Sequence, residues 1–159
     1  MALELVKQYF SKFGLEDKVQ VFQVSSATVE LAAQALLVEP QRIAKTLCFE
    51  AGSGCMLVVT AGDAKIDNTK FKAQFRMKAS MLPPDEVLRL TGHAIGGVCP
   101  FALPVSIPVY LDISMKRFET VFPACGSANS AIELTCDELY FHANGQGWVD
   151  VCKGWNSTL

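Results

Sequence analysis

The stretch KTLCFEAGSGCMLVVTA, residues 45–61, predicts two β-strands joined by a tight turn. The strands cover Lys45 to Ala51 and Cys55 to Ala61. The loop between them, Gly52-Ser53-Gly54, is of the glycine-containing kind that closes β-hairpins. The second run is apolar along its length, so we expect a buried strand. The chain is thus organised around an antiparallel strand pair near its middle.

Helices and strands alternate on both sides of this hairpin. Helical spacing and end signals predict helices over Ala2 to Phe13, Ser26 to Val38, Asn68 to Phe75, Pro84 to Thr91 and Thr135 to Tyr140. Further strands are predicted over Val19 to Val24, Lys78 to Met81, Val109 to Ile113, Thr120 to Phe122, Ile132 to Thr135 and Gly147 to Val151. We find no linker, repeat or low-complexity tract. The sequence therefore predicts one α/β domain over residues 1–159, a mixed sheet with helices packed on it.

Three local signals refine the expected helices. Leu5, Tyr9 and Phe13 share one face of the first helix, and Asn68 is the expected cap of the third. Thr135 and Glu138 have the spacing of a capping box for the last one.

Composition limits the classes of function. Half of the residues are hydrophobic, 19% are charged and the formal net charge is −2, which is typical of a folded globular protein. A protein that grips long DNA by its phosphates is usually basic, so no DNA partner is expected. No signal peptide or membrane-spanning run is evident, and we expect a cytoplasmic protein without a membrane partner. No nucleotide-binding glycine motif is present, so no cofactor is expected.

The six cysteines and two histidines do not form a metal-binding pattern. No cysteine pair has the Cys-x-x-Cys spacing, and His93 and His142 are isolated. We expect no metal site, and cysteines that act mostly as small buried hydrophobes in a reducing cytosol.

Lys45 is the first candidate functional residue. Residues 45, 47 and 49 share one face of a strand, and Leu47 and Phe49 make that face apolar. One interpretation is a lysine at a strand end whose ammonium reaches water. The other is an ammonium at the rim of a pocket, placed to meet an anion or a carbonyl oxygen.

The second candidate is the segment TGHAIGGVCP, residues 91–100. Paired glycines at Gly96 and Gly97 allow a backbone to approach a ligand closely, and Pro100 fixes the exit from the loop. An ordinary bend between strands would have the same composition.

Taken together, these segments resemble the YbaK/EbsC-type aminoacyl-tRNA deacylases, relatives of the editing domain inserted in bacterial prolyl-tRNA synthetases. Lys45-Thr46-Leu47 is similar to that family's lysine-containing strand, and Gly96 to Pro100 to its Gly-x-x-x-Pro loop. Ile132-Glu133-Leu134 also fits, and the similarity extends from about Leu3 to Val151. The resemblance implies a compact α/β fold and hydrolysis of aminoacyl-tRNA esters in trans.

The resemblance also implies roles for individual residues. Lys45 would contact the terminal adenosine or other polar atoms of the substrate, and Gly96, Gly97 and Pro100 would shape the backbone around the ester. The expected substrate-binding residues are Thr46, Val98 and Cys99, with His93 and Asp63 added from the residue pattern alone, in which Asp63 also suits a turn. Some relatives have asparagine where this chain has Thr46, and many have serine where it has Cys99. These departures bear on the choice of amino acid more than on the reaction.

An aminoacyl ester is already activated, so its hydrolysis needs little beyond a held water and donors for the oxyanion. Backbone N–H groups of the glycine loop and the substrate's own ribose hydroxyl would meet that need. His93 is a candidate general base, with a structural role as the alternative. Lys70, Lys72, Arg76 and Lys78 form a basic stretch that would suit either solvent or the tRNA acceptor end.

The sequence thus predicts a trans-editing hydrolase that deacylates mischarged aminoacyl-tRNA with a small aminoacyl group, of the Cys-tRNA or mischarged Pro-tRNA type. The expected partners are the aminoacylated tRNA acceptor end and an aminoacyl-tRNA synthetase. Two alternatives stay open. One is a non-catalytic module that binds aminoacyl-tRNA or a synthetase, and the other is a thiol enzyme that uses Cys99.

Overall fold

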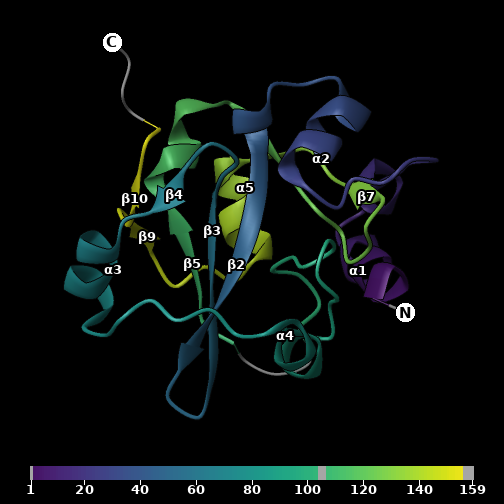
Figure 1. Cartoon of the computed structure of the whole chain (residues 1–159). Helices are drawn as coiled ribbons and strands as arrows, with labels where there is room; N and C mark the ends of the chain where they lie inside the picture. Colours follow the sequence, from purple (N-terminus) through teal and green to yellow (C-terminus); the bar gives the residue numbers. More distant parts are fainter. Residues whose placement is uncertain (1, 104–106, 156–159) are drawn as a thin grey trace.

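The predicted hairpin forms the centre of a six-stranded sheet (Figure 1). The computed structural model of the protein describes residues 2–103 and 107–155. Strand β2 (Ile43–Ala51) pairs antiparallel with β3 (Gly54–Ala61), and Ala51 lies opposite Gly54. The turn itself is therefore Gly52-Ser53, with Gly52 at a φ of 58°. A positive φ of this kind favours glycine, which explains the residue at this point.

The sheet is mixed, as the alternation of elements predicted. Its order is β8-β6-β2-β3-β5-β9, in which β2–β6, β3–β5 and β5–β9 are parallel pairs and β2–β3 and β6–β8 are antiparallel. The other four strands of this sheet are β5 (Val109–Asp112), β6 (Thr120–Pro123), β8 (Leu134–Thr135) and β9 (Trp148–Val149). Two small antiparallel pairs flank the sheet, β1 (Gln20–Val21) with β7 (Ser130–Ala131), and β4 (Lys65–Ile66) with β10 (Cys152–Lys153).

Helices pack around this sheet. They are α1 (Ala2–Ser11), α2 (Val29–Leu36), α3 (Asn68–Phe75), α4 (Pro84–Thr91) and α5 (Cys136–His142), with 3₁₀ turns at Glu16–Lys18, Pro40–Arg42 and Ile113–Arg117. The capping box at Thr135 and Glu138 is confirmed, and Gly92 ends α4 at a φ of 80°. The predicted α/β architecture is therefore confirmed.

Strand β3 lies at the centre of the hydrophobic core. Its side chains from Leu57 to Val59 are fully buried, and Phe71 of α3, Val87 of α4 and Leu139 of α5 belong to the same core. Burying one such aliphatic side chain stabilises the fold by about 1.5–3 kcal/mol. Helix α2 packs separately, on the start of β2 and on β6, where Ala32 and Ala33 meet Ile43 and Phe122. This second contact fixes the chain that leads into α2.

The face shared by Leu5, Tyr9 and Phe13 is not the buried face of α1. Val6 and Phe10 are fully buried, whereas Leu5 and Phe13 are 53% and 42% exposed. The two apolar stripes of this helix are one residue apart, and only contact with the sheet distinguishes them.

Five predicted strands are shorter than expected, among them Val109–Ile113, which ends at Asp112, and Ile132–Thr135, which begins at Leu134. Residues 78–81 form only a single bridge, Met81 to Phe49, because Pro83 and Pro84 follow and lack the N–H groups that a longer ladder needs. The first predicted strand is reduced to Gln20–Val21. The last ends at Val149, since the Val151 N–H is donated to the Asp112 carboxylate at 2.8 Å instead of to a strand.

The cap of α3 also differs from the prediction. The Asp67 carboxylate accepts hydrogen bonds from the N–H groups of Thr69 at 2.9 Å and Lys70 at 3.1 Å. These bonds lower the pKa of Asp67, and the Lys70 N–H contributes most. Asn68 is instead the first residue of the helix. Both residue types suit a cap, and the backbone path selects the earlier one.

Asp67 should therefore contribute more to the stability of the fold than Asn68. Asp67→Ala should lower the melting temperature by roughly 2–4 °C, the effect of losing one helix cap in a protein of this size. Asn68→Ala is the matched control and should leave it nearly unchanged. Thermal unfolding followed by circular dichroism makes the comparison, and equal losses in both variants would contradict the assignment.

Candidate substrate pocket

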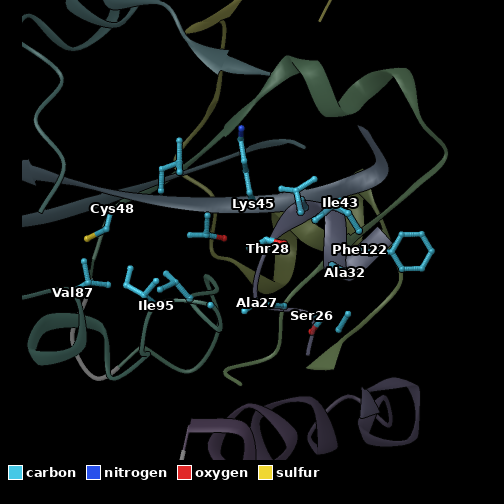
Figure 2. A pocket seen from close by; sticks show the side chains of 18 of the residues that line it. Ser26, Ala27, Thr28, Ala32, Ile43, Lys45, Cys48, Val87, Ile95 and Phe122 are labelled. Atoms are coloured by element: carbon cyan, nitrogen blue, oxygen red, sulfur yellow. The ribbon is translucent and has the colours of Figure 1, made fainter. Parts of the chain in front are cut away.

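A cavity of about 210 Å³ opens between strand β2, the residues before α2 and the loop after α4 (Figure 2). Its wall is mostly apolar. The larger side chains that line it are Val29, Ile43, Leu47, Met81, Leu82, Val87, Ile95, Val98 and Phe122. Five of these nine side chains lie on α2, β2, α4 and β6, so regular elements form much of the wall, as in the largely preformed sites that bind small molecules.

Strand β2 divides its side chains between two sides. Thr46 and Cys48 line the cavity. Lys45, the residue before Thr46, also borders it. Figure 2 shows the Lys45 nitrogen directed away from Ser26 and Ala27, which stand on the side of the strand where Cys48 points. This is the alternation that a pleated strand imposes. Lys45 thus borders the cavity from the strand, while its ammonium points away from the apolar part.

The ammonium of Lys45 is partly buried and has no fixed partner. Burial lowers its pKa, Lys65 acts in the same direction, and the Asp63 carboxylate acts in the opposite one. Among residues 2–103 and 107–155, no carboxylate forms an ion pair with it. A desolvated cation without a partner is placed to bind a polar or anionic group of a ligand.

Two hydroxyl groups in the cavity wall lack hydrogen-bond partners in the described part of the chain. They are Ser26 Oγ and Thr46 Oγ1, both buried. A buried polar group left unpaired costs about 1–3 kcal/mol, so each hydroxyl is available for a ligand. Thr28 has a different role, since its hydroxyl accepts a bond from the Leu31 N–H at 3.1 Å and caps α2.

The loop after α4 supplies backbone groups. Gly96 has a φ of 96° and borders the cavity. The Gly97 N–H is donated to the Ala94 carbonyl at 2.9 Å, whereas the N–H groups of Gly96 and Val98 have no acceptor among the described residues. Free N–H donors at the edge of an apolar cavity are the groups that stabilise an oxyanion.

The two glycines also allow close packing. A Cβ on Gly97 would lie 2.6 Å from the backbone nitrogen of Ser127, and one on Gly96 would lie 3.1 Å from the Ala27 Cβ. The first contact is impossible without moving backbone. Gly97 is therefore required for packing the loop against residues 126–127, a role distinct from ligand binding.

The structure brings together only some of the residues predicted for the site. Lys45, Thr46, Gly96 and Val98 line the cavity. His93 and Pro100 line a different cavity, next to α1. Asp63 is engaged by Arg117, with Oδ1 2.6 Å from Nη2 and Oδ2 3.0 Å from Nη1. Cys99 lines neither cavity and is fully buried.

The environment of Cys99 contradicts a nucleophilic role. Burial raises the pKa of this thiol to about 12, so it is neutral at physiological pH. Its Sγ lies 3.5 Å from Nε2 of His93, but that nitrogen is 2.8 Å from the Phe101 carbonyl and serves as a donor to it. Burial also lowers the pKa of His93. The geometry thus gives no base for the thiol, and neither Cys99 nor His93 reaches the cavity.

Sequence reasoning missed one wall of the pocket. Ser26, Ala27 and Thr28 reach it from the segment before α2, and Phe122 from β6. The Ser-Ser-Ala-Thr run at 25–28 was visible as a helix start, and its meeting with β2 is a tertiary contact. In the part of the chain that the structure describes, no three His, Cys, Asp or Glu side chains gather as a metal site, and no helix is long and apolar enough to cross a membrane.

Comparison with known proteins agrees with the fold. Residues 24–141 match the aminoacyl-tRNA editing domain family, and this chain belongs to that family. The match covers the segments before α2, strand β2 and the glycine loop, which together line the pocket.

Individual relatives support the same assignment. The uncharacterized protein YwhH of Bacillus subtilis (strain 168) is 54% identical over 98% of this chain and 99% of its own length. The proline–tRNA ligase of Lysinibacillus sphaericus (strain C3-41) is 27% identical over 71% of this chain, which corresponds to 20% of the ligase. A solved structure named as a candidate trans-editing enzyme for prolyl tRNA synthetase superposes with a TM-score of 0.86 and 29% identity, covering 96% of this chain and 98% of that one.

The burial of Cys99 leads to a test of the thiol alternative. Cys99→Ala should destabilise the fold slightly and keep turnover of a charged tRNA within about tenfold, because the thiol is neutral and outside the pocket. Iodoacetamide labelling of the native protein, followed by peptide mapping, should leave Cys99 unmodified. Rapid labelling, or a loss of turnover by several orders of magnitude with the fold intact, would restore the thiol mechanism.

Proposed function

We propose that this protein hydrolyses the ester bond of mischarged aminoacyl-tRNA in trans, as a separate deacylase in the cytoplasm. The observation that carries the proposal is a small apolar cavity whose edge combines two free backbone donors, at Gly96 and Val98, with the unpaired ammonium of Lys45. The family match supports the same activity. The volume of about 210 Å³ favours a small aminoacyl group, of the Cys-tRNA or mischarged Pro-tRNA type.

The pocket suggests how the reaction proceeds. The aminoacyl side chain enters the apolar cavity, and the ester carbonyl lies at its edge beside the glycine loop. Water attacks the carbonyl carbon, and the N–H groups of Gly96 and Val98 donate to the oxygen as it becomes negative. The ribose hydroxyl next to the ester helps to transfer the proton, so no Ser-His-Asp arrangement is needed. The C–O bond then breaks, releasing the amino acid and the tRNA with its terminal hydroxyl restored.

Lys45 holds the nucleotide end in this scheme. Its ammonium points away from Ser26 and Ala27 (Figure 2), so it contacts the terminal adenosine or its phosphate in preference to the aminoacyl side chain. This position orients the ester above the apolar cavity, and misplacing an ester by about 1 Å can cost a hundredfold in rate.

The central experiment measures deacylation of a panel of mischarged tRNAs. Wild-type protein should release the amino acid from at least one small aminoacyl-tRNA far faster than the uncatalysed reaction. Tight binding of the same tRNA without turnover would instead identify the non-catalytic binding module.

Lys45→Ala should lower kcat/KM on a cleaved tRNA by about a hundredfold or more, because the terminal nucleotide loses its cationic contact. The fold should persist, as the side chain is only partly buried. Lys18→Ala, at an exposed 3₁₀ turn, is the control and should behave as wild type. Steady-state kinetics decides, and near-wild-type activity of Lys45→Ala would remove this residue from the site.

Thr46→Val should alter the choice of aminoacyl group with little effect on stability, since it replaces an unpaired hydroxyl by a methyl of similar size. The ratio of kcat/KM for a seryl ester to that for an alanyl ester should fall by about tenfold, within the discrimination that one pocket contact provides. Competition between the two charged tRNAs measures this ratio. An unchanged ratio would mean that the Thr46 hydroxyl does not contact the aminoacyl group.

A further inference from the structure

Two lysines face each other across the small sheet at one edge of the molecule. Lys65 of β4 lies directly opposite Lys153 of β10 in the antiparallel register, and both side chains are exposed. Like charges directly opposite across a strand pair are destabilising. Both ammonium groups are open to solvent, so they are available to an anionic ligand, which would also offset the repulsion.

The neighbouring carboxylates are already engaged. Asp67 caps α3, Asp150 pairs with Lys70 at 3.1 Å, and Asp63 pairs with Arg117 at 2.6 Å. Among the residues that the structure describes, Lys65 and Lys153 have no ion-pair partner. Lys153 is near enough to help lower the pKa of Asp67, after the hydrogen bonds to that carboxylate, but neither lysine is held in an ion pair within the described ranges.

The positive charge continues along helix α3. Lys72 is exposed on this helix, and Arg76 and Lys78 are exposed just after it. None of the three is ion-paired in the described part of the chain. Figure 1 shows α3, β4 and β10 together at one edge, on the side opposite α1 and α2. Five unpaired cations thus lie on these elements or shortly after α3, in a chain with a net charge of −2. We call Lys65, Lys72, Arg76, Lys78 and Lys153 the basic edge.

The basic edge reaches the pocket at Lys45. Lys65 is close enough to contribute to the lowered pKa of the Lys45 ammonium, behind burial as the main cause. That ammonium points away from Ser26 and Ala27 (Figure 2). Lys65 thus connects the edge formed by α3, β4 and β10 with the side of the pocket where the nucleotide end of an ester would lie.

We propose that the basic edge binds the phosphates of the tRNA acceptor end, with Lys65 and Lys153 holding the single-stranded 3′ terminus as it enters the pocket beside Lys45. This inference rests on the proposed deacylase function and adds the surface and direction of approach. A polynucleotide is favoured over an acidic protein surface, because in the proposed function the phosphates of the substrate lie next to the ester that enters beside Lys45. Phosphate contacts of this kind position RNA without reading its sequence.

The test compares two double variants on two substrates. Lys65→Gln with Lys153→Gln removes the facing pair, and Lys12→Gln with Lys18→Gln makes the same change in charge beside α1. One substrate is the mischarged tRNA, and the other is the same aminoacyl ester on adenosine alone, which has no phosphate to bind. Kinetics are measured at several salt concentrations.

The edge variant should raise KM for the tRNA about tenfold, leave kcat within twofold and leave hydrolysis of the aminoacyl-adenosine unchanged. The slope of log(kcat/KM) against log[salt] should become shallower by about 1–2, since each lost phosphate contact removes roughly 0.7–0.9. The α1-side variant should match wild type in every measurement.

Three results would overturn the inference. They are an unchanged KM and salt slope in the edge variant, an equal loss on both substrates, and an equal loss in the α1-side variant. Failure of the deacylase proposal is distinguishable, because wild-type protein would then cleave neither substrate. Fluorescence anisotropy with labelled tRNA would still test the surface in that case, and binding that is equally tight for wild type and the edge variant would refute it.

Discussion

The side chains of strand β3 are buried on both faces, so the sheet has to be covered on both sides and extended beyond this strand in both directions. Strand β2 covers one edge of β3 and β5 the other, while α3, α4 and α5 each contribute a fully buried or nearly buried side chain to the same core. The position of β2 follows from this requirement. Every group of the candidate pocket is in turn placed by β2, or by an element packed on it.

The pleat of β2 separates two kinds of recognition. Thr46 and Cys48 border a small apolar cavity, and the alternation of side chains along the strand directs the Lys45 ammonium away from it. An aminoacyl-tRNA has the same division, with a small side chain on one side of the ester and an anionic polynucleotide on the other. The strand thus presents apolar and cationic surfaces a few ångströms apart without placing a charge inside the apolar cavity, where it would be costly.

Local chemistry made much of the fold predictable. The hairpin at 45–61, the capping box at Thr135 and the Gly92 stop each depend on neighbouring residues, and each is confirmed. The buried face of α1, the cap at Asp67 and the short strands depend on which surfaces meet, so local patterns alone do not place them. The same limit applies to the site. Lys45, Thr46 and the glycine loop were indicated by family resemblance, but the contribution of Ser26 and the burial of Cys99 follow only from tertiary packing.

The close approach of Gly97 to Ser127 constrains how the pocket can change in evolution. Because no side chain fits between the two backbones, the glycine loop cannot withdraw from the cavity unless residues 126–127 move with it. Selection for larger aminoacyl groups would therefore act first on side chains outside the loop, such as Ile43 or Phe122. Relatives that differ in substrate should accordingly keep the same loop backbone and diverge at these apolar positions, so that specificity drifts while the reaction is retained.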